Sequence, residues 1–159
     1  MKPTMKAGLA LGLIVAVWML IFGVTGLYKN LELGWIFSVV AMLIQIGALV
    51  WGLKMTAGER RYWGQIGAGM SISLIGAVII LFASLAFGSV FPTDFEAVAA
   101  LQADKFAESG MDEEQIEQTL QMTAFTRTQM FGTIVGVIMT LVTGFIVSLI
   151  AAAPLRKKD

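Results

Sequence analysis

Four uncharged apolar runs constrain this 159-residue chain more than any other feature. They cover residues 7–28, 34–53, 64–91 and 131–153. A run of about 20 apolar residues is long enough to cross the hydrocarbon core of a bilayer. Because an isolated segment in lipid satisfies its own backbone hydrogen bonds only as a helix, each run predicts a membrane-spanning helix. The predicted fold class is all-α: one integral membrane domain over residues 1–159, built as a four-helix bundle.

The composition argues against several classes of function. Only 14% of the residues are charged, whereas a soluble domain has about 25%. The net charge is zero, so there is no basic excess that would bind nucleic acid. Histidine and cysteine are both absent, which removes the commonest general base, the commonest metal ligand and any thiol nucleophile. We therefore expect no catalytic, cofactor-binding or metal-binding residues, and a protein that is not an enzyme.

The charges flanking the runs predict an orientation. An even number of spans puts both termini on one side, together with residues 54–63. That side has eight cations and two acids, whereas the opposite side has three cations and nine acids. The positive-inside rule predicts an inner-membrane protein with cytoplasmic termini and a periplasmic segment at 92–130. The first run exceeds the length of a signal-peptide core and has no small-residue cleavage site after it, so we expect it to remain as a span.

Residues 92–130 predict an acidic helical hairpin outside the membrane. Thr93 and Glu96 have the spacing of a capping box that starts a first helix. Gly110 is typical of the left-handed residue that ends one. Asp112 and Gln115 form a second capping box. No proline or glycine follows before the fourth run, so the second helix is expected to continue into it, either unbroken or with one weak break near residues 126–129.

The second helix of this hairpin carries a candidate interaction face. Ile116 and Leu120 lie four residues apart and form an apolar stripe, beside the acidic Glu113, Glu114 and Glu117. The stripe covers either this protein's own bundle or a partner. The acids could bind Ca²⁺, but they lack the spacing of a calcium loop, and their place at the positive end of a helix dipole explains them without a metal.

The fourth run contains a stripe of small residues at a spacing of four. A stripe of this kind lets another helix approach closely. We interpret it as a packing surface within the bundle, with a homodimer seam as the alternative, and in either case a bulky residue at Gly136 or Gly144 is expected to be disruptive. The stripe consists of Gly132, Gly136, Thr140, Gly144, Ser148 and Ala152.

Several polar residues within the spans leave a second function open. None of them is ionisable, although transporters and channels usually place ionisable groups in their spans. Serine and threonine in a membrane helix more often bond to their own backbone or to a neighbouring helix. A small transporter or channel-like protein is nevertheless the alternative function. The residues that would line its path are Gln45, Ser71, Ser73, Ser84, Thr140 and Thr143.

Two segments carry a resemblance to a known family. The run "SGMDEEQIEQTLQM" between the third and fourth spans, and the close "GFIVSLIAAAPLRKKD", resemble those of the family called domain of unknown function 4199. The resemblance covers nearly the whole chain and implies a four-helix inner-membrane protein of a kind common in Bacteroidota. Members of that family tend to have a proline before the last span, whereas "FTRTQMF" has none here. The resemblance implies no activity.

Taken together, these features predict a small non-enzymatic inner-membrane protein that acts as an accessory or interaction subunit. Its expected partners are membrane lipid and either a second copy or another membrane protein. A membrane enzyme is the third hypothesis, and it would need an acid such as Asp94 buried in a cleft at the membrane edge.

Overall fold

The protein is all-α, as the sequence predicts. The computed structural model describes residues 1–157, apart from the side chain of Leu31. Lys158 and Asp159, which contribute to the predicted charge at the termini, lie outside this part. Four helices are long and apolar enough to cross a membrane: α1 (Pro3–Val24), α2 (Gly34–Lys54), α3 (Tyr62–Val90) and α6 (Gln129–Leu155). The remaining elements are α4 (Phe95–Glu108), α5 (Glu113–Met122) and the 3₁₀ turns η1 (Leu27–Lys29), η2 (Leu31–Leu33) and η3 (Ala124–Arg127).

The first helix differs from its predicted span by about one turn at each end. It begins at Pro3, because proline at the first helical position has the required φ and needs no hydrogen-bond partner for its nitrogen. It ends at Val24, two residues before Gly26, whose φ of 74° is left-handed. The predicted 7–28 span therefore included residues of η1, where apolar composition continues after the helix has ended.

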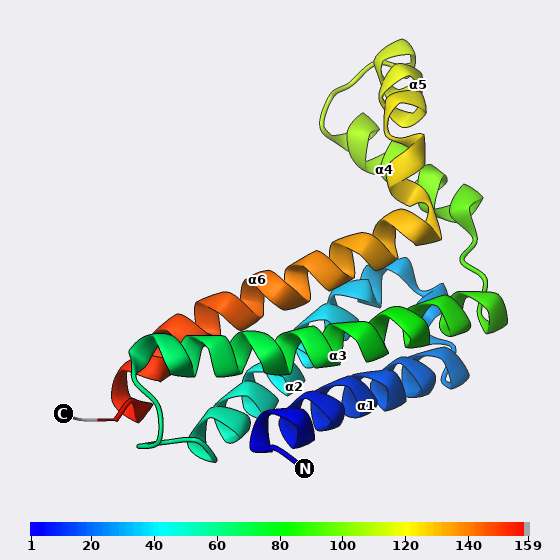
Figure 1. Ribbon diagram of the computed structural model, residues 1–159. Coiled ribbons are helices and arrows are strands. Elements are labelled where there is room, and N and C mark those ends of the chain that lie inside the picture. The colour runs from blue at the N-terminus through cyan, green and yellow to red at the C-terminus, as the bar shows by residue number, and fades with distance from the viewer. Residues whose placement is uncertain (158–159) are drawn as a thin grey trace.

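The four long helices form a bundle in the cyclic order α1–α2–α6–α3 (Figure 1). Both termini lie at one end of the bundle, which we call the terminal end. The other end, where α4 and α5 extend away from the bundle, is the hairpin end. Large apolar side chains remain exposed around the bundle, among them Leu43, Phe82 and Ile150, each more than 60% exposed. Exposed apolar surface on this scale fits contact with lipid.

Glycines allow α1 and α3 to pack at close range. A Cβ at Gly8 would lie 2.7 Å from the Ile75 Cβ, and one at Gly12 would lie 2.5 Å from the Ile79 Cβ. Ordinary carbon–carbon contacts are about 3.5–4.0 Å. The two isoleucines of α3 therefore occupy space that only glycine leaves free on α1, and this seam supports the apolar core around Leu11 and Ile72.

Hydrogen bonds of one buried amide close the terminal end. Gln65 is fully buried, and its Nε2 donates to the Thr56 carbonyl oxygen at 2.7 Å and to the Leu155 carbonyl oxygen at 3.1 Å. Its Oε1 accepts from the Thr56 hydroxyl at 2.8 Å. One side chain of α3 thus holds both the loop after α2 and the last turn of α6.

Candidate functional site

The small-residue stripe of α6 is divided into two halves with different surroundings. In the half toward the terminal end, Thr140, Gly144, Ser148 and Ala152 are buried. A Cβ at Gly144 would overlap the Ser73 hydroxyl, and one at Gly69 of α3 would overlap the Ser148 hydroxyl. This half of the stripe therefore packs against α3, where the two backbones approach closely.

The half toward the hairpin end has open space beside it among the described residues. Gly132 and Gly136 are exposed, and a Cβ at either position would meet no atom within 4 Å. A bulky residue at Gly136 would therefore meet no neighbouring atom within this chain, contrary to the expected disruption. At Gly144 the expected clash is present. Equal spacing in the sequence conceals the difference, because α6 remains bonded to α3 near the hairpin end, through Thr133 and Ser84, but leaves a gap toward α2 there.

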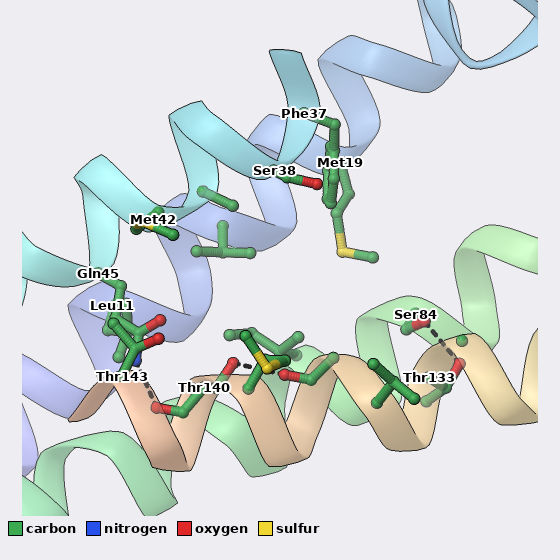
Figure 2. A pocket seen from close by; sticks show the side chains of 17 residues that line it. Leu11, Met19, Phe37, Ser38, Met42, Gln45, Ser84, Thr133, Thr140 and Thr143 are labelled. Atoms are coloured by element: carbon green, nitrogen blue, oxygen red, sulfur yellow. Dashed lines mark hydrogen bonds between the residues drawn. The ribbon is translucent and has the colours of Figure 1, made fainter. Parts of the chain in front are cut away.

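A pocket of about 400 Å³ occupies this gap. Figure 2 shows it between α2 and α6, with α1 and α3 behind. Leu11 and Val15 of α1 are buried and form its floor, whereas Met42 of α2 and Met139 of α6 are 48% and 52% exposed at its mouth. The mouth therefore opens sideways from the bundle, toward the surface that fits lipid contact.

Polar groups lie at both ends of this pocket (Figure 2). Toward the middle of the bundle, Gln45 is only 7% exposed, and its Nε2 donates to the Thr140 carbonyl oxygen. Toward the hairpin end, the hydroxyls of Ser84 and Thr133 are hydrogen-bonded to each other at 2.8 Å. In the part of the chain that the structure describes, no charged side chain lines the pocket.

Of the six residues expected to line a polar path, four line this pocket: Gln45, Ser84, Thr140 and Thr143. The other two lie elsewhere. Ser71 is exposed and donates to the Gly67 carbonyl oxygen at 2.8 Å, a bond within its own helix. Ser73 is fully buried against Gly144, and its hydroxyl has no hydrogen-bond partner.

The predicted start of the first hairpin helix was wrong by one residue. Asp94, not Thr93, is the N-cap of α4, and its Oδ1 accepts from the backbone N–H groups of Glu96 and Ala97 at 3.1 and 3.0 Å. A carboxylate makes charge-assisted bonds that a hydroxyl does not. Asp94 is exposed, whereas the enzyme hypothesis required it to be buried in a cleft.

The boundary between the two hairpin helices was predicted correctly. Gly110 has a φ of 89°, and the Met111 N–H donates to the Phe106 carbonyl oxygen, which completes a glycine-terminated helix end. The Asp112 carboxylate then accepts from the Gln115 N–H at 2.8 Å, while the Gln115 Oε1 accepts from the Asp112 N–H at 3.3 Å. Both halves of the expected capping box are present.

The second hairpin helix does not run unbroken into the fourth span. It ends at Met122, and Thr128 is extended before α6 begins at Gln129. The break covers residues 123–128, so it overlaps the predicted region at 126–129 and starts three residues before it. A threonine cap takes the place of the missing proline, because the Thr128 hydroxyl accepts from the Phe131 N–H at 3.3 Å and starts α6 anew.

Arg127 holds the hairpin together at this break. Its guanidinium donates to the Leu120 carbonyl oxygen at 2.7 Å, to the Gln102 Oε1 at 3.2 Å and to the Thr123 hydroxyl at 3.4 Å. These bonds join α4, α5 and the chain that leads into α6. The sequence could not predict these bonds, because a lone arginine gives no local signal of them.

The candidate interaction face is divided between the inside and the outside of the hairpin. Ile116 and Leu120 are half-buried on α5, which packs with α4. Glu113, Glu114 and Glu117 are exposed. Within residues 1–157, no group of three or more acidic side chains is placed to hold a metal ion.

The fold and the four long apolar helices define a multi-pass membrane protein with an acidic extramembrane hairpin. The chain belongs to the family described as "Protein of unknown function (DUF4199)", whose model matches residues 6–157. No curated protein and no solved structure matches the chain.

Proposed function

We propose that this protein is a non-enzymatic accessory subunit of the inner membrane whose hairpin binds a partner protein. The observation that carries the proposal is that α4 and α5 pack on each other and extend away from the bundle (Figure 1). Neither helix contains a fully buried residue, and the carboxylates of Glu113, Glu114 and Glu117 remain exposed. A projecting acidic face suits a partner with a basic surface, since complementary charge steers association.

Crosslinking from the hairpin tests this proposal directly. A photoreactive amino acid at Glu114 is expected to capture a defined protein in intact cells, and the same group at Glu59, an exposed acid at the terminal end, serves as control. Charge reversal of Glu113 and Glu117 to lysine should reduce the capture. A protein that stays monomeric, copurifies with nothing and yields no adduct specific to position 114 would refute the interaction role.

The proposed orientation places the hairpin in the periplasm and both termini in the cytoplasm. It rests on the cation excess at the terminal end. Because the chain has no cysteine, single cysteines report accessibility without background. Glu114→Cys should react with a membrane-impermeant maleimide in cells whose outer membrane is permeabilised, whereas Glu59→Cys should react only after lysis. The reverse pattern would overturn the orientation.

The alternative function is a small transporter or channel-like protein, and the pocket beside Gln45 gives it some support. It has less support than the accessory role, because the stripe from Thr140 to Ala152 is buried in the terminal half of the bundle. A hydrated path predicts that Ser73→Cys reacts with a water-soluble thiol reagent. Packing of that position against Gly144 predicts no reaction.

A further inference from the structure

The pocket between α2 and α6 contains an acceptor that nothing in the chain uses. Gln45 is more than nine-tenths buried, and the Thr140 carbonyl oxygen occupies its Nε2. Among the described residues, its Oε1 accepts no hydrogen bond, although the side chain lines the pocket (Figure 2). An amide oxygen that faces an apolar cavity gains free energy when it finds a donor. The pocket is therefore suited to a molecule that brings a hydrogen-bond donor.

The dimensions of the pocket indicate the size of that molecule. The lining residues of α6 run from Gly132 to Thr143, which is about 16 Å along a helix that rises ~1.5 Å per residue. An apolar cavity of about 150 Å³ binds benzene, which has six heavy atoms. By proportion, 400 Å³ holds about 16 heavy atoms. A ligand of this length and volume is a single chain rather than a compact ring system.

The lining determines the chemical class. No charged residue faces the pocket, so an ionised head group would be left unpaired. Met19, Met42 and Met139 provide a deformable apolar wall, and Gly132 and Gly136 leave space open beside it. We propose that this pocket binds a neutral, long-chain, membrane-dissolved alcohol, whose hydroxyl donates to the Gln45 Oε1 and whose chain lies along α6.

Trp18 provides an internal reporter for the pocket. Its Nε1 donates to the Phe37 carbonyl oxygen at 3.3 Å, and its ring stacks on that of Phe37, which lines the pocket. Trp35, Trp51 and Trp63 are all exposed and can be replaced by phenylalanine. Trp18 is then the sole tryptophan, and its fluorescence is quenched by bromine atoms nearby.

The test uses this single-tryptophan protein in phosphatidylcholine vesicles. The probe is a brominated tetradecyl alcohol, which matches the size of the pocket, and the comparison probe is its methyl ether, which has no donor. The alcohol is expected to quench Trp18 saturably, at a mole fraction about two- to tenfold lower than the ether, the range expected for one hydrogen bond. Quenching that rises linearly with the mole fraction of alcohol, without saturation, would overturn the proposal. Equal quenching by the two probes would also overturn it.

Three variants separate binding from bulk lipid contact. Gly136→Leu places a side chain in the pocket without a backbone clash and should abolish saturable quenching. Gly47→Leu, at an exposed glycine of α2 outside the lining, is the matched control and should leave it unchanged. Gln45→Met removes the acceptor and should make alcohol and ether equivalent. Saturable quenching that survives Gly136→Leu would overturn the assignment, even if the Gln45 variant fails to fold.

Discussion

Alanine at two glycines of one helix should have different consequences. A Cβ at Gly144 would lie 2.6 Å from the Ser73 Cβ, about 1 Å closer than ordinary carbon contact. Overpacking of this kind costs about 1–3 kcal/mol. A Cβ at Gly136 would meet nothing within 4 Å. Because both substitutions make the same gain in helix propensity, that gain cancels, and Gly144→Ala should be about 1–3 kcal/mol less stable than Gly136→Ala.

Unfolding of the two variants by sodium dodecyl sulfate in mixed micelles, followed by far-UV circular dichroism, measures this difference. Ser73→Gly removes the atoms that the new methyl group would meet. In a double-mutant cycle, it should therefore recover most of the cost of Gly144→Ala. Equal stability of the two alanine variants, or a cycle without coupling, would refute the packing of α6 on α3 through this contact.

Three further substitutions test the hairpin and the terminal end. Arg127→Met should speed amide exchange throughout α4 and α5 without unfolding the bundle. Lys105→Met, at an exposed cation of the same hairpin, is the control and should leave exchange unchanged. Equal exchange rates in the two variants would contradict the role of Arg127. Asp94→Ala should weaken the first turn of α4 by about 1 kcal/mol, measured by amide exchange. Thr93→Ala should have little effect. The reverse result would show that Thr93 is the N-cap, as the sequence predicted. Gln65→Leu should lower stability against detergent unfolding by about 1–3 kcal/mol, because it removes the three hydrogen bonds of a buried amide. Wild-type stability would refute that.

The parts of the fold that depend on local chemistry could be predicted from the sequence. The four apolar runs predict the four long helices because span length and hydropathy depend on neighbouring residues alone. The Gly110–Asp112–Gln115 boundary was predictable for the same reason, since a capping box and a left-handed glycine are complete within six residues.

Competition between local signals explains where the hairpin prediction was wrong. Thr93 and Asp94 are both good N-caps, and only the path of the chain after α3 decides which side chain faces the free N–H groups. The break before α6 has no proline or glycine. Its one local signal is Thr128, the N-cap of α6, whose hydroxyl accepts from the Phe131 N–H, and a threonine is also compatible with the interior of a helix.

The two halves of the α6 stripe show why the candidate site could not be found from spacing. Small residues at every fourth position identify one face of a helix, but the distance to the next helix depends on crossing angles set by many contacts. At Gly144 helix α3 is so close that even a methyl group does not fit, whereas Gly136 faces the pocket between α6 and α2. Gln45 lies where the closely packed half meets the pocket, and its side chain bonds to Thr140 across the space between α2 and α6. The small residues of one stripe thus provide close packing in one half of the bundle and an accessible cavity in the other.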